Sequence, residues 1–71
     1  MEKSIEVVER ITMQLLDSCQ MWIRQIRDNA IYLSEMSTTD DQIEHWDLVE
    51  VRANNAIVEL ESLRKAMEAE P

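Results

Sequence analysis

The chain of 71 residues contains no glycine, and its only proline is the last residue, Pro71. Glycine and proline are the residues that most often interrupt a helix, so nothing in the interior breaks one. Glu, Leu, Met, Gln, Arg and Ala, which favour helices, are plentiful. The sequence therefore predicts an all-α protein built from long helices. The lack of glycine also excludes the glycine-rich loops that bind phosphate groups.

One polar cluster, Ser-Thr-Thr-Asp-Asp at residues 37–41, divides the chain into two helical segments. Thr39 is followed three residues later by Gln42, a spacing typical of a capping box at a helix start. Two long helices joined by a short turn fold back as an antiparallel hairpin, whereas one continuous helix is the alternative that the cluster disfavours. We expect one domain over residues 1–71, with helix 1 at about 4–35, a turn at 36–39 and helix 2 at about 40–68.

Apolar residues recur in both segments at steps of three and four, which keeps them on one face of a helix. In helix 1 the line comprises Val8, Ile11, Leu15, Cys19, Trp22, Ile26, Ala30 and Leu33. In helix 2 it comprises Trp46, Val49, Ala53, Ala56, Leu60, Leu63 and Met67. From these lines we predict the residues of core or dimer packing to be Leu15, Cys19, Trp22, Ile26, Trp46, Val49, Ala53, Ala56, Leu60 and Leu63.

In this hairpin each tryptophan is expected to face small residues of the other helix, so that the two seams interlock without voids. Counting outward from the turn places Trp22 opposite Ala53 and Ala56, and Trp46 opposite Ala30.

More apolar surface is present than one hairpin can bury. Apolar residues cover about half of the circumference of helix 1, and Leu48, Val51 and Val58 form a further line on helix 2 that we predict as a second interface. A core of this size supplies only about 3–5 kcal/mol, and the sequence offers no disulfide or metal to supplement it. We therefore expect a homodimer that forms a four-helix bundle, although a different protein partner would cover the same surface.

The net charge of −8 is concentrated on helix 2. The acidic side chains near the start of helix 2 have two possible interpretations. They complement the helix dipole and form a solvated face, or they dock a partner protein that has a basic surface. So acidic a chain, with no basic stripe, is not expected to bind nucleic acid. The candidate acidic docking patch consists of Asp40, Asp41, Glu44, Asp47 and Glu50.

Few residues are available for catalysis or metal binding. Cys19, the only cysteine, lies among apolar residues, so packing explains it more simply than nucleophilic chemistry. His45, with Asp41 one turn before it, offers two metal ligands and lacks a third. We predict no enzymatic activity, no catalytic residue, no metal and no cofactor. The longest apolar run, residues 30–33, is too short to span a membrane, and the single cysteine with no export signal favours the cytoplasm.

The predicted architecture is similar to that of Rop-like RNA-binding dimers, type III secretion co-chaperones and small phage-encoded regulators. The resemblance is one of architecture without a shared motif, and the acidic charge departs from the RNA-binding group. We predict a small, acidic, non-enzymatic protein-interaction module that binds a partner protein, as a phage or mobile-element accessory regulator does. A chain that begins Met1-Glu2-Lys3 is expected to be a complete gene product. The alternative is a co-chaperone or structural subunit whose apolar seam holds a partner helix.

Overall fold

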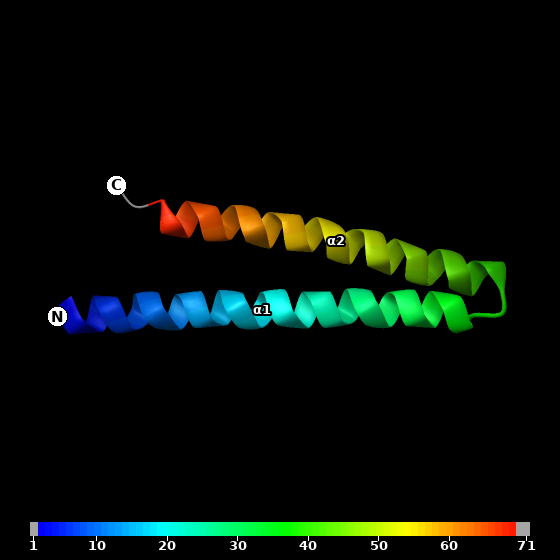
Figure 1. Cartoon of the computed structure of the whole chain (residues 1–71), viewed down its shortest axis with the longest axis horizontal. Coiled ribbons are helices and arrows are strands. Elements are labelled where there is room, and N and C mark those ends of the chain that lie inside the picture. Colours follow the sequence, from blue (N-terminus) through cyan, green and yellow to red (C-terminus); the bar gives the residue numbers. More distant parts are fainter. Residues whose placement is uncertain (1, 70–71) are drawn as a thin grey trace.

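The computed structural model describes residues 2–69, which form two antiparallel α-helices (Figure 1). Helix α1 spans Glu2–Met36 and helix α2 spans Asp40–Glu68. The prediction of an all-α helical hairpin is confirmed, and the turn lies where the polar cluster of the sequence placed it. Neither helix, over its described residues, has an apolar stretch long enough to cross a membrane.

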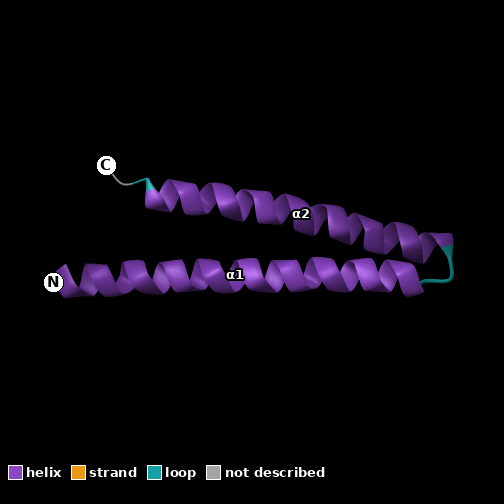
Figure 2. Cartoon of the chain, viewed as in Figure 1, coloured by secondary structure: helices purple, strands orange, loops and turns teal. Residues whose placement is uncertain are grey.

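A short loop joins the two helices (Figure 2), and its side chains close both helix ends. Ser37 Oγ donates to the carbonyl of Leu33 at 2.6 Å, and the Ser37 N–H donates to the carbonyl of Ser34 at 3.2 Å. Thr39 has extended backbone angles, φ −118° and ψ 149°, and its Oγ1 accepts from the N–H of Gln42 at 3.3 Å. Thr39 is therefore the N-cap of α2, as the capping-box spacing predicts. Within residues 2–69 the Gln42 side chain makes no return bond to Thr39.

The Thr39 cap leads to a first prediction. Thr39→Ala removes the acceptor for the Gln42 N–H and is expected to destabilise the fold by about 1 kcal/mol. In a chain of this length that corresponds to a fall in melting temperature of about 4–8 °C, measured by circular dichroism. Thr39→Ser keeps the hydroxyl and should melt close to the unmodified chain. An equal loss in both variants would show that the hydroxyl is not responsible.

The hairpin is one helix layer thick. Its extents are 57 × 19 × 12 Å, and a single helix with its side chains is about 10–12 Å across. The radius of gyration is 16.7 Å, whereas a compact chain of this length has about 11 Å. Stable domains generally pack two layers around one core, so this molecule has half of such an arrangement.

The core between the helices is correspondingly small. Among the described residues, the buried apolar side chains are Leu16, Ala30, Ala53 and Ile57. The one buried polar residue of this part of the chain, Gln20, accepts through Oε1 from Arg64 Nη2 at 2.6 Å.

Two polar cross-links set the register of α1 against α2. Arg64 Nη2 donates to Asp17 Oδ1 near the open end of the hairpin, and Ser34 Oγ donates to Asp47 Oδ1 at 2.6 Å near the turn. Exposed pairs of this kind contribute little stability, about 0–1 kcal/mol for an ion pair, but they are directional. Midway between the two cross-links, residues 25–26 of α1 lie opposite residues 55–56 of α2.

Candidate functional site

Helix α1 turns a different set of side chains toward α2 than the sequence predicts. Its buried or half-buried residues are Met13, Leu16, Gln20, Ile23, Arg27, Ala30, Ile31 and Ser34. The predicted packing residues Leu15, Cys19, Trp22 and Ile26 are exposed, so in the single chain they are not core residues. Their packing between two chains stays a prediction.

The physical reason for this correction is the width of the apolar arc on α1. Leu15 and Leu16 are both apolar, as are Trp22 and Ile23, and neighbours in a helix lie about 100° apart. Either edge of the arc can face α2. In the structure the edge that carries Leu16 and Ile23 faces α2, and Asp17 beside it pairs with Arg64.

On α2 the predicted packing residues lie mostly against α1. Ala53 is buried, Trp46, Val49, Ala56 and Leu60 are half-buried, and Leu63 is exposed.

The exposed edge of the α1 arc lines a groove along one face of the hairpin. The groove has two adjoining hollows of about 520 Å³ each, both open to solvent, which share Ile23 and Ala56. In the hollow nearer the open end, further lining residues are Cys19, Trp22, Glu59 and Leu60. In the hollow nearer the turn, they are Ile26, His45, Leu48, Val49, Arg52 and Ala53. We call this surface the apolar groove; its wall is almost wholly apolar, and Arg52 and Glu59 are its two charged groups.

Exposed apolar side chains extend the groove along both helices. Leu15 and Leu33 continue the α1 line seven residues from Trp22 and Ile26, and Leu63 follows Glu59 by one turn of α2. We call the apolar groove together with Leu15, Leu33 and Leu63 the groove face. A contiguous exposed apolar patch of this extent usually marks a binding surface.

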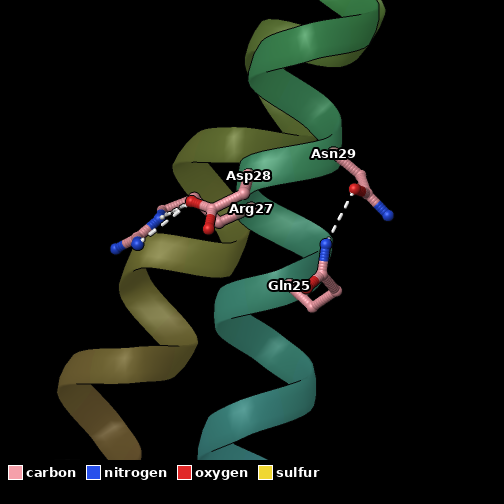
Figure 3. A network of polar contacts seen from close by, with 4 residues as sticks. All are labelled: Gln25, Arg27, Asp28 and Asn29. Atoms are coloured by element: carbon pink, nitrogen blue, oxygen red, sulfur yellow. Dashed lines mark hydrogen bonds and ion pairs between the residues drawn. The ribbon is translucent and has the colours of Figure 1, made fainter.

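Polar contacts gather away from the groove face. Arg27 Nε and Nη2 donate to Asp28 Oδ1, both at 3.2 Å, and Figure 3 shows this pair on the side of α1 that approaches α2. Gln25 Nε2 donates to Asn29 Oδ1 at 3.0 Å on the other side of α1 (Figure 3). None of these four residues lines the apolar groove, so its two hollows are separate from these polar contacts.

The candidate acidic docking patch does not form one surface. Asp40, Glu44 and Asp47 lie within about 60° of one another around α2, whereas Asp41 and Glu50 point to either side. Asp47 is engaged by Ser34, and Glu50 is half-buried. The structure thus brings together three of the five carboxylates near the turn.

The three residues of the predicted second interface do not lie on one surface. Leu48, Val51 and Val58 are all exposed. Leu48 lines the apolar groove, whereas Val51 and Val58 lie on the outer edge of α2. These two edge residues are outside the groove face.

The sole thiol and the sole imidazole both line the apolar groove. Cys19 is exposed rather than buried in the single chain. The His45 ring packs edge-on against Trp46, with ring centroids 4.7 Å apart and an interplanar angle of 74°. Across the described residues, no group of three or more His, Cys, Asp or Glu side chains is placed to hold a metal ion.

The charged pair in the groove is the feature that the sequence analysis missed. Arg52 and Glu59 are seven residues apart, a spacing that places them on one helix face, but only the position of α1 shows which face is open.

Comparison with family models, with characterised protein sequences and with solved structures gave no match. A shallow apolar groove with so few polar groups is suited to an apolar protein surface rather than to a small polar substrate.

Proposed function

We propose that this chain is a small, acidic, non-enzymatic protein-interaction module that works as a homodimer. In this arrangement the groove faces of two chains pack together and form a four-helix bundle. The observation that carries the proposal is the exposed groove face on a molecule only one helix layer thick. A second copy supplies the missing layer.

The exposed surface area supports this arrangement. The chain exposes 5894 Å², whereas a globular monomer of 8.4 kDa exposes about 4,600 Å². The excess of roughly 1,300 Å² per chain amounts to about 2,600 Å² for two chains. Interfaces of permanent dimers bury about 2,000–5,000 Å² in total. The surplus is therefore of the size that a stable dimer buries.

In such a dimer the polar surfaces remain available to a partner protein. Asp40, Glu44 and Asp47 project beside the turn, where they favour a partner with a basic surface. The acidity of the chain makes nucleic acid an unsuitable partner. Small size and acidity are consistent with an accessory regulator of phage or mobile-element type. A cytoplasmic setting, which the single cysteine favours, is part of this proposal.

The groove also supports a second candidate function, a co-chaperone or structural subunit. In that case a single amphipathic helix of another protein occupies the apolar groove. The observation that favours it is the shape of the site, a channel between two helices lined by apolar side chains from both. The two candidates differ in what covers the groove when the chain is alone.

Substitutions at two almost equally exposed residues distinguish the homodimer from the partner-helix role. Leu48 is 53% exposed and lines the groove, whereas Val51 is 54% exposed, one turn later, and lies outside it. Leu48→Glu is expected to prevent dimerisation because it places charge in an apolar interface. Val51→Glu should leave the dimer intact. The measurement is light scattering after size exclusion, over about a hundredfold range of chain concentration.

The expected masses are about 17 kDa, twice the chain mass of 8.4 kDa, for the unmodified chain and Val51→Glu, and about 8.4 kDa for Leu48→Glu. A helical unmodified chain of 8.4 kDa at every concentration would contradict the homodimer and favour the partner-helix role. Disruption by Val51→Glu alone would place the interface on the outer edge of α2.

A further inference from the structure

We propose that the second copy docks on the groove face in one orientation, set by a pair of reciprocal ion pairs. The two-fold axis runs across the helices and passes α2 between Asn55 and Ala56. Arg52 of each chain then pairs with Glu59 of the other. This inference rests on the proposed homodimer and specifies its geometry.

The two charged groups of the groove carry the argument. Arg52 and Glu59 are both exposed at the groove, and neither forms an ion pair with another described side chain. Both would be enclosed when a second apolar layer covers the groove. An enclosed charge is costly unless it meets an opposite charge, so the favoured orientation is one that pairs them.

An antiparallel contact of α2 with α2 provides this pairing. About an axis between residues 55 and 56, Arg52 lies as far from the axis on one side as Glu59 does on the other. The same axis places Leu48 opposite Leu63 of the second chain. Arg52 thus meets Glu59 and Leu48 meets Leu63 on either side of the axis, where Asn55 and Ala56 lie opposite each other.

Helix α1 gives an independent check on the position of the axis. An antiparallel contact of α1 with α1 about residue 24 places Trp22 opposite Ile26, and Leu15 opposite Leu33. The cross-links within the hairpin place residues 25–26 of α1 opposite residues 55–56 of α2, where the axis passes. The two centres agree within two residues, about 3 Å along a helix.

The other face-to-face arrangement, with the two-fold axis along the helices, is disfavoured by the same charges. It places α1 of one chain on α2 of the other in the register of the hairpin itself. Arg52 then lies near Asn29, and Glu59 lies near Trp22. Neither charge has an opposite partner, and a carboxylate is pressed against an indole ring, which lacks a compensating cation.

Charge exchange between two variants tests the orientation. Arg52→Glu and Glu59→Arg each create two like-charge contacts in the dimer, and each is expected to weaken it roughly tenfold at low salt. The double variant should restore the affinity. When the two single variants are mixed, both ion pairs form in the mixed dimer, which should exceed the statistical half of all dimers. A tag on one variant and mass spectrometry of the captured dimers measure this fraction.

Arg24→Glu and Glu61→Arg are the matched controls. Both positions are exposed, and neither lines the groove. Their mixture should give only the statistical half. A mixture of Arg52→Glu and Glu59→Arg that also gives the statistical half would overturn the orientation while leaving the homodimer intact. A wild-type chain that stays monomeric would overturn the homodimer as well, so the two failures are distinguishable.

Discussion

Trp22→Ala is expected to weaken the proposed dimer about a thousandfold. In the single chain the Trp22 side chain is 62% exposed at the apolar groove, so the substitution removes little from the hairpin core. A central buried tryptophan typically contributes about 2 kcal/mol or more to an interface. Two copies per dimer contribute about 4 kcal/mol, and each 1.4 kcal/mol is tenfold in affinity. Sedimentation equilibrium measures the change.

Tyr32→Ala is the control for this prediction. Tyr32 is 61% exposed, as Trp22 is, but it does not line the groove. It should dimerise as the unmodified chain does. Equal effects of the two substitutions, or none from either, would show that the groove face is not the surface that associates. A loss of helicity in Trp22→Ala at every chain concentration would instead show that Trp22 packs in the core of the single hairpin.

Ile57→Ala is expected to unfold much of the protein at 25 °C. Ile57 is 8% exposed and is one of four buried apolar residues in the described part of the chain. Truncating a buried isoleucine costs about 2–5 kcal/mol, and a core of this size supplies about 3–5 kcal/mol. Urea unfolding followed by circular dichroism measures the loss. Because the proposed association with a second copy would add stability, both proteins must be compared at one chain concentration.

Val58→Ala, at the next residue, is the matched control. Val58 is 62% exposed on the outer edge of α2, where truncation changes stability by about 0.5 kcal/mol or less. A large loss in this variant would show that the outer edge is packed. A small loss in Ile57→Ala would mean that the contact between α1 and α2 contributes little to the fold.

The local features of this fold were readable in the sequence, whereas the facing of α1 was not. The absence of glycine, the polar cluster at residues 37–41 and the Thr39 cap act within a few residues, so they predict both helices and the turn. The pairings that orient α1, such as Asp17 with Arg64, join residues 47 positions apart. Both edges of the apolar arc satisfy the same periodicity. The choice between them depends on contacts that spacing does not reveal.

The residues of the candidate site could be predicted only in part, for the same reason. The sequence indicated surplus apolar surface, and of the groove residues it assigned Leu48 to a second interface and Trp22 and Ile26 to core or dimer packing. Trp22 and Ile26 lie in the wide apolar arc of α1, and periodicity alone does not show which part of that arc packs against α2. Arg52 could be placed in the groove only once the structure showed which side of α2 is open.

The hairpin has its turn at one end and both described chain ends at the other (Figure 1). In the proposed dimer, a two-fold axis across the helices would give a rod whose two halves are alike, each with one turn and its Asp40, Glu44 and Asp47. Asp40, Glu44 and Asp47 lie about 8–16 residues from the axis, so at 1.5 Å per residue the two carboxylate groups stand roughly 25–45 Å apart along that rod. A partner with two basic sites at that separation would gain avidity from bivalent engagement, whereas a partner with one site would not. Spacing, as well as charge, would then decide which proteins this module holds.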